Sequence, residues 1–207
     1  TGSKDYYDFS RLVVEEELVV VSINYRLGAL GWFTHPAIQK FQTGVDQSSN
    51  LGTLEIIEAL PWIKQNIDKF GGNPGNVTIF GESAGGHNVL ALLVSPQAKG
   101  LFHKAIIQSG YTSSASLESA YNKNAVDPLV HRGSWQMTHR LLPHRQSTLP
   151  NYHDDLEQLS GIRESLRALD AKDLIIDYSH ERDEDYTPLT KSEGIVHRNL
   201  WLVSALK

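Results

Sequence analysis

Cysteine is absent from this sequence of 207 residues. Its absence excludes disulfide bonds, thiol catalysis and thiolate metal sites, but it leaves the cellular compartment open. No apolar run approaches the roughly 20 residues that a membrane-spanning helix needs, so we expect no membrane span. The longest strongly apolar stretch, residues 18–23, has the length of a strand.

Basic side chains are also fewer than acidic ones: 19 against 24, which gives a net charge of −5 at pH 7. This mild acidic balance argues against nucleic acid or an anionic membrane as the main partner. The chain is 40% hydrophobic and 21% charged, which excludes a disordered polypeptide and provides for a core. Its length favours one domain, or one domain and part of another.

The sequence begins with Thr1 rather than methionine, and no basic-then-apolar signal region follows. We therefore expect that processing or truncation has removed the original start. The cellular location and the oligomeric state are left open by this sequence. It contains no internal repeat and no low-complexity tract.

The first part of the chain alternates between strand and helix signals. Residues 18–25 are continuously apolar and rich in β-branched side chains, as in a strand covered on both faces, and residues 77–80 and 104–109 predict two further strands. Apolar residues at three- and four-residue spacing predict helices over about 53–70 and 84–94. This alternation predicts an α/β fold in which the three strands lie side by side in a parallel sheet.

The second part of the chain has a helical pattern. Ile162, Leu166 and Leu169 recur on one face of a predicted helix, and no stretch has the strand signal of the first part. We therefore divide the chain into a sheet-forming region over 1–110 and a mostly helical region over 111–207.

The most informative segment is Gly81-Glu82-Ser83-Ala84-Gly85. A G-x-S-x-G pentapeptide is weak evidence alone, but a strand before it and a helix after it make it strong evidence for a nucleophilic serine. A serine on so sharp a turn has a strained backbone, so we predict a positive φ at Ser83 and a need for small residues beside it. The backbone N–H of Ala84, at the start of the helix, can donate to an oxyanion. The alternative is a glycine-rich turn with an idle serine.

With this pentapeptide, four ordered segments resemble the type B carboxylesterase family, the carboxylesterase/cholinesterase branch of the α/β-hydrolases, in a form similar to its bacterial members. The resemblance is dense over the first 110 residues and sparse beyond them. The four segments are Asn24-Tyr25-Arg26-Leu27-Gly28-Ala29-Leu30-Gly31, Asn50-Leu51-Gly52-Thr53-Leu54, Phe70-Gly71-Gly72-Asn73-Pro74-Gly75-Asn76-Val77-Thr78 and Gln108-Ser109-Gly110.

The resemblance implies an α/β-hydrolase fold, with a central, mainly parallel sheet and flanking helices. It also implies an enzyme that hydrolyses small-molecule carboxylic esters through an acyl-enzyme, without a cofactor, by a serine–histidine–acid triad in which Ser83 is the nucleophile. Glu82 matches a buried acidic residue that tunes the site electrostatically, and Ser109 matches a buried serine close by. For Glu82, a structural role as a hydrogen-bond acceptor under the turn is an equal alternative.

Two positions depart from the family's pattern. Arg26 resembles an arginine that pairs with an aspartate in the following helix, but the longer Glu55 stands at that position, so the pairing geometry is open. Pro61 lies inside the helix predicted over 53–70, where it removes one hydrogen bond and should kink the helix.

Histidines give no clear general base for the serine. His87 lies four residues after Ser83 on the same helical face, whereas a base approaches from the far side of the pocket, so we expect His87 to pack or to support the site. The histidines of residues 111–207 form no pair with convincing metal-ligand spacing inside a clear helix or strand, so we predict no metal site.

In α/β-hydrolases the triad acid and histidine follow the serine, after later strands. The resemblance places this acid just beyond Lys207 and the oxyanion glycines before Thr1. We therefore expect residues 1–207 to be the central fragment of one α/β-hydrolase domain and a poor esterase by themselves.

Two other functions stay open. A non-catalytic adhesion or interaction module could use the same fold, although such relatives often lose the serine that is present here. A self-contained esterase could instead complete its triad with Asp177 and His197, which occur in the expected order but without a supporting strand.

Overall fold

The computed structural model describes residues 7–112, 116, 120–121, 133–142, 155–175 and 200–206. The chain forms two compact units, one that contains the sheet and one that is helical. The sheet unit comprises Thr1–Leu27, Gly52–Ser113 and Ile195–Lys207, and the helical unit comprises Gly28–Leu51 and Ser114–Gly194.

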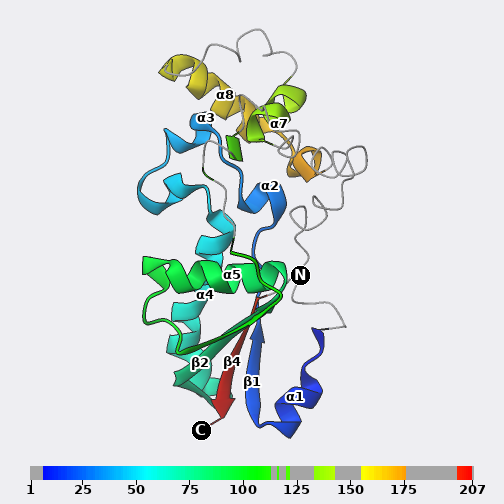
Figure 1. The fold of residues 1–207 in the computed structure, drawn as a ribbon. Coiled ribbons are helices and arrows are strands. Elements are labelled where there is room, and N and C mark those ends of the chain that lie inside the picture. Colours follow the sequence, from blue (N-terminus) through cyan, green and yellow to red (C-terminus); the bar gives the residue numbers. More distant parts are fainter. Residues whose placement is uncertain are drawn as a thin grey trace. The chain divides into compact units, whose positions relative to one another are not determined.

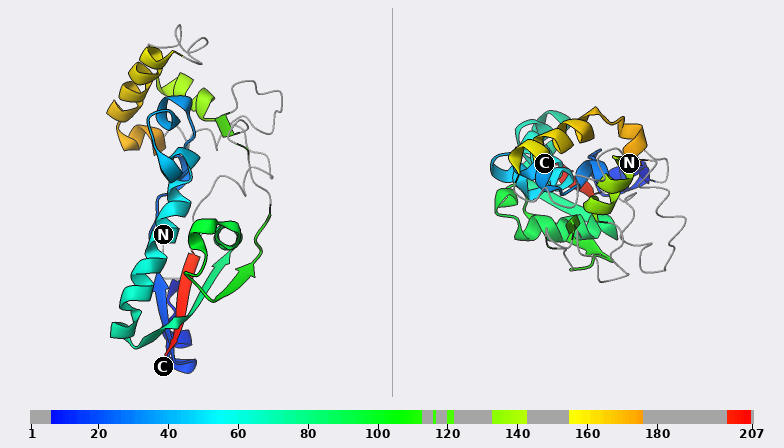
Figure 2. Two further views of the ribbon diagram at one scale, coloured as in Figure 1. Left: turned by 90° about the vertical axis from the view of Figure 1, so that its left-hand side faces the viewer. Right: turned by 90° about the horizontal axis from the view of Figure 1, so that it is seen from above.

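Among the described residues, four strands form the sheet in the order β1-β4-β2-β3 (Figures 1 and 2). Strands β2 and β3 pair in parallel, whereas β4 pairs antiparallel with both β1 and β2. Three strands, β1, β2 and β3, therefore run in one direction and β4 runs against them. The strands are β1 (Leu18–Ser22), β2 (Gly72–Glu82), β3 (Lys104–Gln108) and β4 (Leu200–Leu206).

The prediction of an α/β fold is confirmed, although only one of the three described strand pairings, β2 with β3, is parallel. The prediction that the three strands are adjacent is wrong. Strand β4 lies between β1 and β2 and fills both of their facing hydrogen-bonding edges (Figure 2). An unpaired backbone edge inside a sheet is costly, which favours such a partner. Strand β4 lies in the region where the sequence showed no strand signal of the quality of residues 18–25.

Helix α4 (Leu51–Asn66) follows the predicted periodicity and continues as the 3₁₀ turn η3 (Ile67–Phe70). Gly71, with φ 86°, is the C-cap that ends it. Pro61 lies within α4, which spans the residue despite the hydrogen bond that proline cannot donate.

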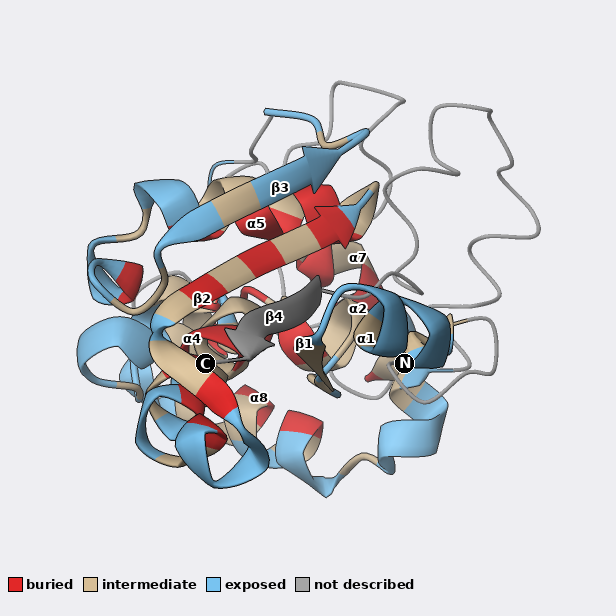
Figure 3. Cartoon of the chain, turned by 90° about the horizontal axis from the view of Figure 1, so that it is seen from below, coloured by how far each residue is buried: buried red, intermediate tan, exposed pale blue. Residues whose placement is uncertain are grey.

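Helices α4 and α5 (Ala84–Val94) contribute to one core cluster with Val77 and Ile79 of β2. Because residues two apart on a strand point to the same side, both helices cover the same face of β2. Strand β3, at the edge of the sheet, is mostly exposed (Figure 3). The 3₁₀ turn η4 (Pro96–Ala98) follows α5.

The N-terminal segment reaches the opposite face of the sheet. Phe80 alternates with Ile79 and therefore points away from the helices. Its ring meets that of Phe9 edge to face, with the ring centroids 5.7 Å apart. Helix α1 (Ser10–Glu15) then leads into β1.

The helical unit has its own apolar core, and its longest described helix is α8. Asp155 caps α8 by accepting hydrogen bonds from the amides of Glu157 and Gln158. The helix contains Ile162 and Leu166 of the predicted apolar face, and Leu169 is its C-cap. The core residues are Ala37, Leu142, Leu159, Ile162 and Leu166, with Leu169 packed against them. The helices are α2 (Gly28–Gly31), α3 (Pro36–Gln39), η2 (Gly44–Ser48), α7 (Ser134–Leu141) and α8 (Leu156–Ala168).

His35 caps α3 from a fully buried position. Its Nδ1 accepts a hydrogen bond of 3.0 Å from the backbone N–H of Ala37, so this nitrogen carries no proton. Burial, which penalises the charged imidazolium, lowers the pKa of His35 from 6.5 to about 3. The helical unit therefore contains a histidine that stays neutral at physiological pH.

None of the helices in the described part of the chain has the length and apolar character needed to cross a bilayer.

Candidate active site

Ser83 occupies the single position between the end of β2 and the start of α5. Its backbone has φ 53° and ψ −113°, so the predicted positive φ is confirmed. Such a conformation is strained for a residue with a side chain, and strain of this kind persists only where the surrounding structure enforces it.

Two glycines allow this turn to close. A Cβ atom at Gly81 would lie only 2.3 Å from the carbonyl carbon of Gly85 and 2.4 Å from its oxygen. The clash would be with backbone, which cannot move aside as a flexible side chain can. The small residue expected at position 81 is thus required by its close contact with the backbone of Gly85, and Gly81 is buried.

The backbone of Ser83 is held from two directions. Its N–H donates to the carbonyl oxygen of Gln108 over 2.7 Å, and its carbonyl oxygen accepts from the N–H of His87 over 2.9 Å. The side chain of Ser83 makes no capping hydrogen bond to its own helix. The turn is therefore fixed through the main chain, and the hydroxyl group is not used to cap α5.

Ala84 is the first residue of α5. The first amides of an α-helix have no partner within the helix, and the aligned peptide dipoles place partial positive charge at this end. A backbone N–H at this position can donate to an oxygen that develops negative charge next to the serine.

The end of β3 packs against the start of α5 through a second pair of glycines. A Cβ atom at Gly86 would lie 3.0 Å from the Cα of Gly110, and one at Gly110 would lie 2.9 Å from the carbonyl carbon of Gly86. Ser109, which precedes this contact, also has a positive φ, 51°. Glu82 of β2 lies opposite Gln108 of β3 in the parallel pairing. The two serines with positive φ therefore directly follow paired residues of neighbouring strands.

His87 makes two non-covalent contacts with Tyr111 across this glycine contact. Their rings stack with centroids 4.3 Å apart and an interplanar angle of 20°. Nδ1 of His87 also lies 2.7 Å from the carbonyl oxygen of Tyr111. A carbonyl oxygen only accepts, so Nδ1 carries the proton in this contact. His87 thus packs as the sequence predicted.

Glu82 and Ser109 differ from what the resemblance implied. Both residues were expected to be buried, but both are exposed in the structure. They end or follow neighbouring parallel strands, at the edge of the sheet where Ser83 also lies. The described residues around this edge do not cover them, so any effect on Ser83 would come from exposed groups.

Arg26 and Glu55 do form a pair. The carboxylate of Glu55 accepts from the backbone N–H of Arg26 over 2.8 Å and from Nε of Arg26 over 2.5 Å. Their side chains are 48% and 36% exposed, so the pair is not buried. The extra methylene of glutamate therefore does not prevent the pairing, whose role is structural: it joins the end of the β1 segment to α4.

The other proposed triad members, Asp177 and His197, lie outside the described residues. Within the described ranges, no group of three or more histidine, aspartate or glutamate side chains is arranged to hold a metal ion.

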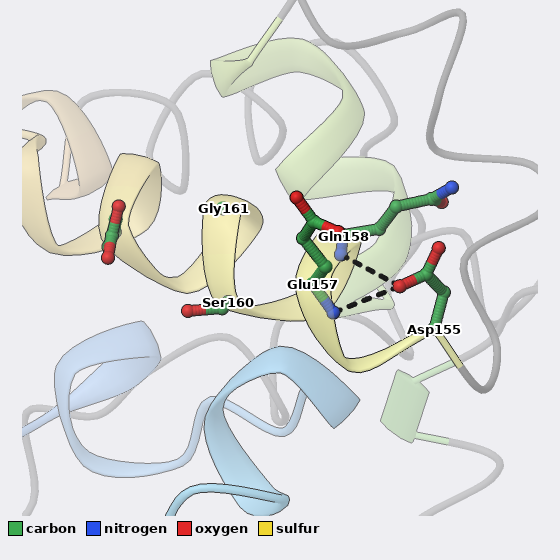
Figure 4. Close-up of a pocket in the computed structure, with 6 residues that line it drawn as sticks. Asp155, Glu157, Gln158, Ser160 and Gly161 are labelled. Carbon is green, nitrogen blue, oxygen red and sulfur yellow. Dashed lines mark hydrogen bonds between the residues drawn. The ribbon is translucent and has the colours of Figure 1, made fainter.

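A hollow on the surface of α8 contains three carboxylates (Figure 4). One of them, Asp155, is already used to cap the helix. The hollow offers acceptors and a hydroxyl but no histidine or cationic group for acid–base work. Its lining residues are Asp155, Glu157, Gln158, Ser160, Gly161 and Glu164.

Tyr111 and the contact between Gly86 and Gly110 were not predicted from the sequence. The signals available in the sequence were the glycine two residues after Ala84 and the glycine directly after Ser109. Neither signal shows which backbone the glycine approaches, because that depends on how the helix packs against the strand.

Comparisons with known proteins point to one family. The family model of the carboxylesterase family matches residues 1–150. Para-nitrobenzyl esterase of Bacillus subtilis (strain 168) is 48% identical over 124 residues, which are 60% of this chain and 24% of that protein. Cocaine esterase of Homo sapiens is 52% identical over 109 residues, 53% of this chain and 18% of that protein.

The solved structure of a PNB esterase resembles this chain with a TM-score of 0.63 and 34% sequence identity. The likeness covers 88% of this chain and 33% of the esterase. The chain thus spans about a quarter or less of the length of these two curated relatives and a third of this solved one.

Proposed function

This chain belongs to the carboxylesterase family and has its α/β-hydrolase fold, and we propose that it carries the nucleophile, Ser83, of an enzyme that hydrolyses small-molecule carboxylic esters. The observation that supports this most is the backbone of Ser83, with φ 53° and ψ −113° in the turn between β2 and α5. A strained serine on a sharp strand-to-helix turn, with glycines two residues to either side, is the geometry that α/β-hydrolases use to present a nucleophile.

In the first step, Oγ of Ser83 attacks the ester carbonyl carbon while its proton passes to a general base. The electron pair of the carbonyl double bond moves to the oxygen, which becomes an oxyanion. The backbone N–H of Ala84 donates to this oxyanion, and the N-terminus of α5 adds favourable charge.

In the second step, the tetrahedral intermediate collapses and the bond to the alkoxy oxygen breaks. The alcohol leaves with the proton that the base had taken, and the acyl group remains on Ser83. Water then attacks the acyl-enzyme by the same path and releases the carboxylic acid. Acyl transfer of this kind uses neither a metal nor an organic cofactor.

The residues around Ser83 have supporting roles in this proposal. The Gln108 carbonyl and the glycine contacts fix the turn, so the nucleophile and the Ala84 amide keep one relative position. Glu82 and Ser109, at the same edge of the sheet, are proposed to shape the electrostatic field at the serine. The nucleophile turn belongs to region 1–110, and region 111–207 is proposed as the mostly helical part of the same domain.

A fluorophosphonate probe tests the proposal, because it phosphonylates serines that are activated as nucleophiles. We expect the intact protein to be labelled on the peptide that contains Ser83, and Ser83→Ala to abolish labelling. Ser95→Ala is the matched control, since Ser95 lies at the other end of α5, and it should be labelled like the wild type. A folded intact protein without label at Ser83 would contradict the proposal and favour a non-catalytic module.

A further inference from the structure

Tyr111 stands at the edge of the sheet where the parallel strands β2 and β3 end. Ligands of open parallel sheets bind outside the carboxyl ends of the strands. Ser83 follows the end of β2, and Tyr111 lies three residues after the end of β3. Tyr111 is 36% exposed, so part of this aromatic residue remains available at that edge.

The ring of Tyr111 is held rigidly. His87 stacks on the ring and, through Nδ1, also binds the carbonyl oxygen of the same residue. One side chain therefore fixes both the ring and the main chain of Tyr111. A surface aromatic held in place before binding loses less entropy when a ligand packs on it.

The position of this stack is tied to the nucleophile. The N–H of His87 donates to the carbonyl oxygen of Ser83, one helical turn away, and residues four apart lie on the same face of a helix. The Gly86–Gly110 contact brings the end of β3 against that turn. Ser83, His87 and Tyr111 therefore belong to one local assembly within the sheet unit.

From this juxtaposition we propose that Tyr111, held by His87, is an aromatic wall beside Ser83 that favours esters carrying a flat aryl ring. The inference rests on the proposed function and names a substrate class for it. Tyr111 contacts the substrate and determines specificity, and His87 is a positioning residue that acts through Tyr111.

Aromatic rings gain stabilisation from stacked or edge-to-face contact beyond that of apolar burial alone. A saturated ring of similar size is buried as well but lacks this contact. The wall should therefore raise kcat/KM for an aryl ester over its saturated analogue by about two- to tenfold. The gain should appear mainly in KM, because the wall contacts the substrate away from the bonds that change.

The experiment measures Ser83-dependent hydrolysis by the intact protein on two matched pairs of esters. Benzyl acetate against cyclohexylmethyl acetate places the ring on the alcohol side. Methyl phenylacetate against methyl cyclohexylacetate places it on the acyl side. The readout is the ratio of kcat/KM within each pair, which cancels changes in general activity.

We expect an aryl preference in at least one pair, and Tyr111→Leu should reduce it toward unity. Tyr111→Phe should keep it, and Tyr111→Met serves as a second variant without a flat ring if the leucine variant does not fold. Trp62→Leu, which removes a 51% exposed aromatic on α4, is the matched control and should not change the ratio. The pair that responds identifies the side of the ester that meets the wall.

The support by His87 has its own test. His87→Ala should lower the aryl preference through KM, and His87→Phe, which retains a ring for stacking, should restore it. Lack of rescue by phenylalanine would overturn the positioning role.

Two outcomes separate this inference from the proposed function. Ser83-dependent turnover without an aryl preference, or with a preference that Tyr111→Leu and Tyr111→Met leave intact, would overturn the inference alone. An intact, folded protein without Ser83-dependent turnover would overturn the proposed function and the inference with it.

Discussion

Val77 and His103 exchange two hydrogen bonds where β3 approaches β2. The N–H of Val77 donates to Nδ1 of His103 over 3.0 Å, and the N–H of His103 donates to the carbonyl oxygen of Val77 over 2.8 Å. Val77 is 1% exposed, so its N–H has little access to water. A histidine side chain therefore serves as the acceptor for a buried backbone donor just before the parallel pairing begins at Lys104.

Replacing His103 with alanine should destabilise the sheet unit. The N–H of Val77 would lose its acceptor, and an unsatisfied buried donor typically costs about 1–3 kcal/mol. His103→Asn should cost less, because its amide oxygen can accept the same bond. Urea unfolding of the wild type and the two His103 variants measures these differences. Equal losses in the free energy of unfolding for alanine and asparagine would show that the hydrogen bond does not contribute to stability.

Gly81→Ala should disrupt the nucleophile turn. The new methyl group would lie 2.3 Å from the backbone of Gly85, so the turn must open or the helix must shift. We expect a loss of about 1–3 kcal/mol in the free energy of unfolding, together with loss of fluorophosphonate labelling. Gly75→Ala is the control, because its methyl group would meet only the Asn73 side chain, at 3.2 Å. A labelled, fully stable Gly81→Ala protein would contradict the close contact.

Ser83→Ala and His87→Ala should differ sharply in the intact protein. Loss of a triad nucleophile typically lowers kcat by about 10⁴-fold or more, so Ser83→Ala should abolish turnover of short-chain aryl esters. His87 packs on Tyr111 and not in the position of a base, so its alanine variant should lose no more than about tenfold. Steady-state kinetics on p-nitrophenyl acetate distinguishes the two variants. Equal losses of activity in Ser83→Ala and His87→Ala would show that His87 is itself a catalytic residue.

Acid should destabilise the helical unit through His35. Its pKa is about 3 in the folded protein and near 6.5 in the unfolded chain. Above pH 6.5 both states are neutral at this residue, and its contribution to stability is fully present. Between pH 6.5 and about 3 only the unfolded state gains the proton, so stability falls by up to about 1.4 kcal/mol per pH unit.

His35→Asn isolates this effect, because asparagine keeps an acceptor for the Ala37 amide and cannot titrate in this range. Urea unfolding of the full chain at pH 7.5, 6 and 5 gives the difference in stability between the two proteins. This difference should shift in favour of asparagine as the pH falls. A difference that is independent of pH would show that His35 takes up its proton equally in both states.

Local features were predictable from the sequence because their causes lie within a few residues. Helix α5 spans 84–94 as predicted, since the glycine-rich turn starts it and Pro96 follows its end. The positive φ of Ser83 follows from the same pentapeptide. The fold class is likewise set by the alternation of apolar strand and helix patterns in the first part of the chain.

Features that depend on distant partners were not predictable in this way. Strand β4 was missed, although residues 200–206 read Leu-Trp-Leu-Val-Ser-Ala-Leu, because a short apolar run does not reveal its period or its neighbours. The stack of His87 on Tyr111 was missed because it follows from the approach of Gly86 to Gly110 across two elements. The exposure of Glu82 depends on which segments cover the edge of the sheet.

The position of β4 also bears on the order in which the molecule can assemble. Leu18 pairs with Ala205, and Val77 pairs with Ser204, so the middle of the sheet joins segments that leave the ribosome far apart in time. Until residues 200–206 have been synthesised, β1 and the facing side of β2 have no partner in this sheet. Pairing at such long sequence separation slows folding much more than it lowers stability, because the entropy of loop closure rises only with the logarithm of loop length. The facing edges of β1 and β2 therefore stay unpaired in this sheet until β4 has been synthesised.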